Sequence, residues 1–95
     1  MKLFLVHCGF YDLDLCDGIY ESHVNFFVAG HDFEDAKVKV KVLPEFKKKR
    51  MHVDGVQEVI AVQGYRMSLQ EDKSLNGETI LVSSRHRDLA TPKPL

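Results

Sequence analysis

The first third of the chain shows two apolar patterns that are typical of β-strands. Residues 2–8 form a short, almost continuous apolar run, which predicts a strand buried on both faces, and Gly9 ends it. Residues 10–18 are rich in aspartate and glycine and predict a loop. Residues 19–29 predict a second strand, whose side chains alternate with a period of two. One side of this strand holds Val24, Phe26 and Val28, and the other holds Glu21, His23, Asn25 and Phe27.

Residues 33–43 fit two patterns. Asp32 is a good N-cap, acidic residues follow it, and the apolar residues recur at helical spacing. Residues 37–42, in contrast, alternate lysine and valine as a strand would, and valine favours extended backbone. We predict a helix over residues 33–43, because the cap is well formed and the basic run at residues 47–50 lies just beyond its C-terminal end.

The second half of the chain predicts three more strands. Gln63-Gly64 separates two of them and is typical of a tight hairpin turn. The expected elements are a turn at Val53-Asp54-Gly55, strands at 56–62, 65–70 and 78–84, a polar loop at 71–77 and a loose tail at 85–95.

The predicted element order is therefore β-β-α-β-β-β in a single domain, residues 1–84, followed by a flexible C-terminal tail, residues 85–95. This order indicates an α+β fold in which one helix packs on one face of a single, mostly antiparallel sheet. Since one helix covers only one face, the other face must be polar or must meet a partner.

Composition places the chain among ordinary small globular proteins. It has 95 residues, of which 44% are hydrophobic and 28% charged, which indicates one domain. A domain of this size buries only about 60–65% of the surface of its unfolded chain, so a dimer interface would add to a thin stability. The net charge of −1 gives no overall attraction to nucleic acid or to an anionic membrane.

The chain is expected to be soluble and cytoplasmic, with no membrane partner. No apolar run reaches the length of a membrane span. Asp12 and Asp14 follow the first run closely, so we interpret that run as a strand and not as a signal peptide. Cys8 and Cys16 lack CxxC spacing, and we expect both to be reduced thiols without a catalytic role.

Short polar motifs accompany these elements. They pair Glu21 with His23, Ala36 with Lys37, and His52 with Asp54, and they occur with the apolar opening at residues 2–6 and the Gly64-Tyr65 step. Over roughly residues 1–70 these motifs resemble a family of small bacterial proteins catalogued as domain of unknown function 1543. The resemblance implies no activity. Some relatives look like two copies in tandem, which implies that a single-copy chain forms a homodimer.

Two histidines and two carboxylates are the strongest candidates for chemistry. Glu21 and His23 share one face of the second strand, and His52 and Asp54 form a second pair before the third. If the strand register brings the pairs together, His23, His52 and Asp54 could bind a divalent metal such as zinc, or the set could perform acid–base catalysis. The ligand spacing is loose, so a purely structural role, with Asp54 accepting backbone N–H bonds, is the favoured alternative.

The remaining histidines are weaker candidates, and other catalytic classes lack their motifs. His7 ends the first strand and could join the same face, whereas His31 precedes the helix cap and is expected in solvent. The glycines form no phosphate-binding loop, and no serine lies in a nucleophile elbow. The basic run at residues 47–50 is expected to be a solvated helix end, with Phe46 packed inward.

Three functions follow, in decreasing order of support. The first is a non-enzymatic binding module that self-associates as a homo-oligomer through the open sheet face, with Phe27 as an anchor and Glu21, His23 and Asn25 as polar contacts. The second is a small metal-binding protein or metal-dependent enzyme that uses His23, His52 and Asp54. The third is weak nucleic-acid binding through the lysine-rich helix.

Overall fold

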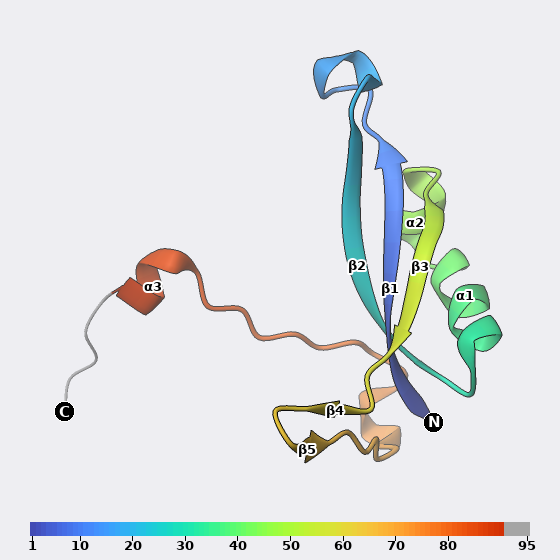
Figure 1. Cartoon of the computed structure of the whole chain (residues 1–95), viewed down its shortest axis with the longest axis vertical. Coiled ribbons are helices and arrows are strands. Elements are labelled where there is room, and N and C mark those ends of the chain that lie inside the picture. Colours follow the sequence, from blue (N-terminus) through green and yellow to red (C-terminus); the bar gives the residue numbers. More distant parts are fainter. Residues whose placement is uncertain (91–95) are drawn as a thin grey trace.

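A three-stranded antiparallel sheet with two helices on one face forms the body of the protein (Figure 1). The computed structural model describes residues 1–90. The strands are β1 Lys2–Tyr11, β2 Glu21–Gly30 and β3 His52–Glu58, in the order β2-β1-β3, and the helices are α1 Phe33–Lys41 and α2 Pro44–Lys48. The shorter elements are η1 Cys16–Gly18, β4 Ala61–Val62, β5 Tyr65–Arg66, η2 Lys73–Leu75 and α3 His86–Ala90.

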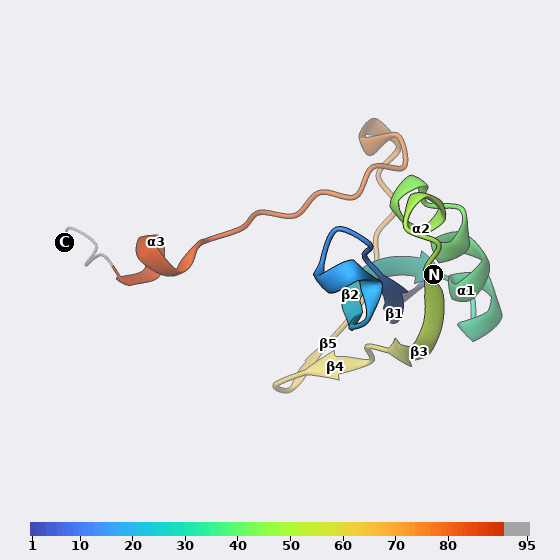
Figure 2. The same cartoon turned by 90° about the horizontal axis from the view of Figure 1, so that it is seen from above.

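Alternation along the central strand divides the sheet into a buried face and an open face. The buried side chains of β1 are Phe4, Val6, Cys8 and Phe10. The helices and the turn after them add Ala36, Val40, Phe46 and Met51 to the same core. Figure 2 shows both helices on one side of the sheet. The prediction of a small α+β fold with an antiparallel sheet covered on one face is confirmed.

The lysine–valine segment is helical, as predicted. The Oδ1 atom of Asp32 accepts the backbone N–H of Asp35 at 2.8 Å and so caps the helix. Ala36 and Val40 lie one turn apart and are both fully buried, whereas Val38 between them is 61% exposed. A strand would place all three on the same face, so this burial pattern is that of a helix. The helix ends two residues earlier than predicted, because Pro44 starts the separate helix α2, which the sequence pattern did not predict.

The turn predicted at Val53-Asp54-Gly55 is wrong, because these residues lie inside β3. The register of β3 against β1 shifts between His7 and Cys8: Gly55 pairs with His7, Val53 pairs with Cys8, and Asp54 is the additional residue. Such a β-bulge uses the same residue types as a turn, which explains the misleading signal.

The hairpin around Gln63-Gly64 is confirmed, but the single sheet is not. Both turn residues have positive φ, 50° and 87°, as a two-residue hairpin turn requires. The predicted strand 56–62 is interrupted after Glu58, and the predicted strand 65–70 ends at Arg66. The short strands β4 and β5 therefore pair only with each other, in a separate two-stranded sheet.

The strand predicted over residues 78–84 is also wrong as a sheet element. This segment has no strand partner in the described part of the chain, and it leads into α3, within the predicted tail. We call residues 78–90 the arm; Figures 1 and 2 show it projecting away from the body. Residues 91–95 of the predicted tail lie outside the described residues. Across residues 1–90, no helix combines the length and apolarity needed to cross a bilayer.

Candidate functional site

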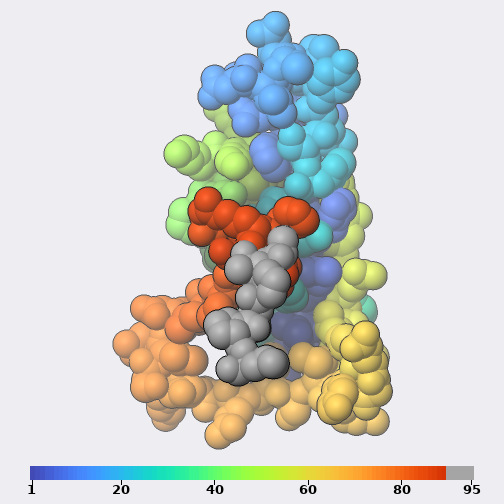
Figure 3. Space-filling view, turned by 90° about the vertical axis from the view of Figure 1, so that its left-hand side faces the viewer, coloured from blue at the N-terminus to red at the C-terminus, as the bar shows by residue number. Residues whose placement is uncertain are grey.

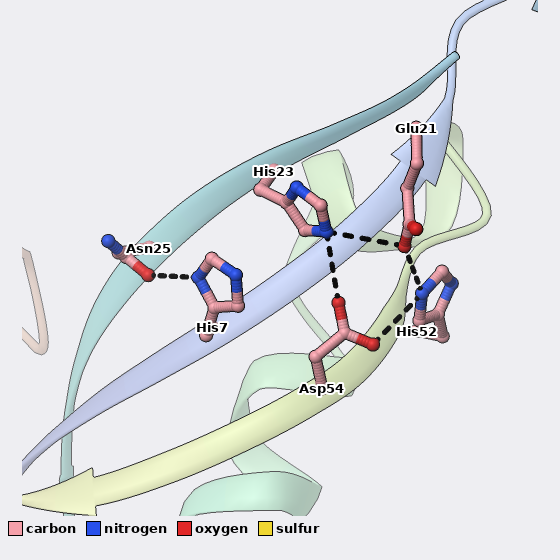
Figure 4. Close-up of polar contacts among 6 residues, drawn as sticks. All are labelled: His7, Glu21, His23, Asn25, His52 and Asp54. Atoms are coloured by element: carbon pink, nitrogen blue, oxygen red, sulfur yellow. Dashed lines mark hydrogen bonds and ion pairs between the residues drawn. The ribbon is translucent and has the colours of Figure 1, made fainter.

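The open face of the sheet carries a group of converging polar side chains (Figure 4). The register places Gly9 of β1 directly between His23 of β2 and His52 of β3. Glu21 precedes His23 by two residues and Asp54 follows His52 by two, so each pair extends along one strand on the same face. We call Glu21, His23, His52 and Asp54 the His–carboxylate cluster.

Each imidazole in the cluster contacts both carboxylates. His52 Nε2 lies 2.7 Å from Glu21 Oε1 and 3.1 Å from Asp54 Oδ1. His23 Nε2 lies 3.4 Å from Glu21 Oε1 and 3.4 Å from Asp54 Oδ2. The structure therefore brings together all four residues that the sequence singled out, from two strands that are not neighbours in the sheet.

Gly9 makes this convergence possible. A Cβ atom built on Gly9 would overlap Glu21 Oε1 and would lie 2.6 Å from His52 Nε2 and 2.8 Å from Asp54 Oδ2. The polar groups therefore meet directly above the glycine Cα, in space that any other residue would fill. From the sequence, Gly9 was expected only to end the first strand. Gly9 lies inside β1, where a glycine often marks a close approach of other groups.

The bulge in β3 supplies the second carboxylate. Asp54 is the additional residue opposite the His7–Cys8 step of β1, and its two oxygens face different imidazoles. Gly55 follows it, and a Cβ at that position would meet nothing within 4 Å. The bulge thus adds a carboxylate beside His52 without adding a competing side chain next to it.

The two imidazoles and the two carboxylates of the cluster share a small space. Four N···O contacts of 3.4 Å or less join the two Nε2 atoms to carboxylate oxygens, and the 2.7 Å contact between His52 and Glu21 is a hydrogen bond. A cation among these atoms would accept electron pairs from imidazole nitrogens and carboxylate oxygens together.

Three side chains of the cluster are close enough to share a metal ion. Bonds of about 2.0–2.1 Å to zinc separate neighbouring ligand atoms by about 3.3 Å, and the four contacts span 2.7 to 3.4 Å. Ligand atoms of Glu21, His52 and Asp54 all lie within 4.8 Å of one another, so these three form the tightest set. His23 contacts both carboxylates and is the candidate for a fourth ligand. The structure thus adds Glu21 to the predicted metal ligands.

His7 supports the cluster from the side. Its ring stacks on that of His23, with centroids 4.8 Å apart and planes 12° from parallel. Its Nδ1 lies 2.7 Å from Asn25 Oδ1, which fixes the orientation of the ring. His7, His23 and Asp54 also offer ligand atoms within 4.8 Å. The lone pairs of an imidazole lie in the plane of its ring, so two stacked parallel rings do not direct them at the same point. His7 is therefore better placed to hold the His23 ring than to share a metal ion with it.

Two other candidate residues lie elsewhere. Cys8 is next to Gly9 but points into the core, where burial raises the pKa of its thiol and the Asp54 carboxylate raises it further. Cys8 therefore stays protonated and is no thiolate ligand. His31 lies just before α1, where its backbone N–H donates to Asp35 Oδ2 at 2.8 Å, outside the cluster.

The side chains of the cluster are accessible to solvent. Those of His23 and His52 are 41% and 47% exposed, and those of Glu21 and Asp54 are 31% and 33% exposed. A small ion can therefore reach the cluster directly from water.

No family model, curated protein or solved structure matches the chain.

Proposed function

We propose that this protein binds a divalent cation, with zinc the preferred ion, through Glu21, His52 and Asp54, with His23 as the fourth ligand. The observation that carries the proposal is the meeting of two imidazoles and two carboxylates over Gly9, joined by four nitrogen–oxygen contacts of 3.4 Å or less. Two nitrogen ligands favour zinc over magnesium or calcium, which prefer ligand sets made entirely of oxygen.

The competing interpretation is a structural clasp that joins the two outer strands across β1. In a clasp each Nε2 carries a proton and donates it to a carboxylate, whereas metal ligation needs an unprotonated Nε2. The two interpretations therefore differ in whether zinc binds and releases protons, which zinc titration measures.

Replacing His52 with alanine is expected to lower zinc affinity by more than the tenfold to hundredfold typical of losing an outer-shell partner, because it removes a direct ligand. Isothermal titration of tag-free protein with zinc measures this. The matched control is His31→Ala, which removes an imidazole outside the cluster and should leave the affinity unchanged. Equal affinities for both variants, or no zinc binding by the parent protein at neutral pH, would refute the proposal.

Self-association is the second function that we propose, as a non-enzymatic interaction module. Phe27 lies on the open face and is 49% exposed, and the arm carries Ile80, Leu81 and Val82, which are 61%, 67% and 98% exposed. Apolar side chains gathered on such surfaces are typical of interfaces. Light scattering is expected to give twice the chain mass of 10.9 kDa at micromolar concentration and above. A mass of one chain at every concentration would contradict this.

Three further proposals rest on the sequence. Membership of the domain of unknown function 1543 family is supported by the Glu-x-His and His-x-Asp motifs. A cytoplasmic location fits the two free thiols, Cys8 and Cys16. Weak nucleic-acid binding is the least supported, because Lys49 contacts Glu45 and lies over the ring of Phe10, 4.8 Å from its centroid.

A further inference from the structure

Residues 78–84 have the sequence of a strand but no sheet to join. Thr79, Ile80 and Val82 are β-branched, which favours extended backbone. Residues 79–84 make no backbone hydrogen bond with any other described residue. Val82 is 98% exposed, so its side chain touches almost nothing within its own chain. A hydrophobic strand sequence left bare in water indicates that a partner is missing.

The β2 edge of the sheet is open to such a strand. β2 pairs with β1 along its whole length without a bulge, and within residues 1–90 no strand pairs with its other side. Residues 22–30 contain no lysine, arginine, aspartate, glutamate or proline, the residues that usually block an exposed edge. Lys39 of α1 donates to the Ala29 carbonyl at 2.8 Å and covers only this end of the strand.

The opposite edge is protected in the usual ways. β3 is seven residues long, carries a bulge at Asp54, and ends at Glu58, which pairs with Lys2 at 3.7 Å. Of the two edges of the three-stranded sheet, the β2 edge has no bulge and is longer, so it is the better site for the addition of another strand.

A wide hollow runs beside this edge. It has a volume of about 1620 Å³ and is open to solvent, and it is lined by residues 25–29 of β2, by Leu43 and Pro44 at the α1–α2 junction, by residues 68–73 and 75–79, and by Leu81 of the arm. The backbone edge of β2 is therefore accessible from this hollow. Figure 3 looks onto this side of the molecule, with the arm in red directed toward the viewer.

We propose that residues 78–84 of one copy add as a fourth strand to the β2 edge of a second copy. The proposal rests on the self-association inferred above and names the elements that carry it. The arm runs away from the body and makes no backbone hydrogen bond with the β2 edge of its own chain, which leaves its backbone groups free for the edge of another molecule (Figures 1 and 2). Reciprocal exchange of two arms closes a two-fold symmetric dimer and removes both open edges.

Hydrogen exchange at two protein concentrations tests this directly. We expect the amides of residues 79–84 to exchange slowly where light scattering gives a dimer, and fast after dilution to the monomer. A dimer whose arm amides exchange fast would overturn the strand addition and leave self-association standing. A monomer with fast arm amides would refute both. A monomer with slowly exchanging arm amides would show that the arm pairs within its own chain, which also overturns the proposal.

Leu81→Pro and Val82→Pro provide the mutational test. Consecutive N–H groups of a strand point to opposite sides, so at least one of these prolines removes a donor that the pairing needs. We expect the worse of the two to weaken dimerisation at least tenfold. The control is Leu13→Pro, in the exposed turn between β1 and β2 and outside both the arm and the hollow, which should leave the dimer intact. Dimerisation unchanged by both arm variants would overturn the proposal.

Discussion

Replacing Gly9 with alanine is expected to remove zinc binding and to leave the three-stranded sheet folded. The new Cβ would occupy the space in which Glu21 Oε1, His52 Nε2 and Asp54 Oδ2 meet. All three atoms are the far ends of side chains at an accessible surface, so they swing outward and the backbone stays in place. We expect an affinity loss of about a hundredfold or more, with a change in unfolding free energy of no more than about 1 kcal/mol.

Gly55→Ala is the matched control for this experiment. Gly55 is the other glycine of the same face, it pairs with His7, and a Cβ there meets nothing within 4 Å. Zinc titration and thermal unfolding of both variants separate loss of the site from loss of the fold. If Gly9→Ala binds zinc as tightly as Gly55→Ala does, the cluster does not ligate the metal in the arrangement described above.

Local signals in the sequence were sufficient for the first half of the fold. The Asp32 cap and the helical spacing of Ala36 and Val40 outweighed the alternation of lysine and valine, and the structure agrees. Both long strands before the helix were also predicted, although β1 extends to Tyr11 and β2 starts at Glu21. In each case the signal in the sequence lies within a few residues along the chain.

The second half failed where the outcome depends on distant partners. An aspartate followed by a glycine is equally suited to a turn and to a bulge, and pairing with β1 decided in favour of the bulge at Asp54. Residues 78–84 have strand propensity, but propensity alone supplies no neighbouring strand. Helix α2 starts at Pro44 and was not predicted, because a helix of five residues is too short to show a periodic pattern of apolar residues.

The candidate site was predicted in part from local signals and in part depends on distant partners. Strand periodicity placed Glu21 beside His23 and His52 beside Asp54 from the sequence alone. Their meeting required the register of both outer strands against β1, which no local pattern contains. Gly9 shows the same limit: the absence of a side chain becomes informative only when its neighbours across the sheet are known.

Replacing Phe4 with alanine is expected to cost about 3–5 kcal/mol of unfolding free energy. Phe4 is fully buried at the centre of the core, and its ring meets that of Phe33 edge to face, with centroids 5.5 Å apart. Small domains have a total stability of about 5–15 kcal/mol, and a chain of this size belongs near the lower end. The variant should therefore be largely unfolded at 37 °C, as urea denaturation monitored by circular dichroism would show.

A matched pair makes this result specific to the core. Phe27→Ala removes the same ring from the open face, where the side chain is 49% exposed, and should cost about 1 kcal/mol or less. Phe4→Leu keeps most of the buried volume and should retain a measurable transition if the alanine variant does not fold. Equal losses from Phe4→Ala and Phe27→Ala would mean that the open face is covered as completely as the core. In that case Phe27 on the open face would lie in the interface between copies, in addition to the arm.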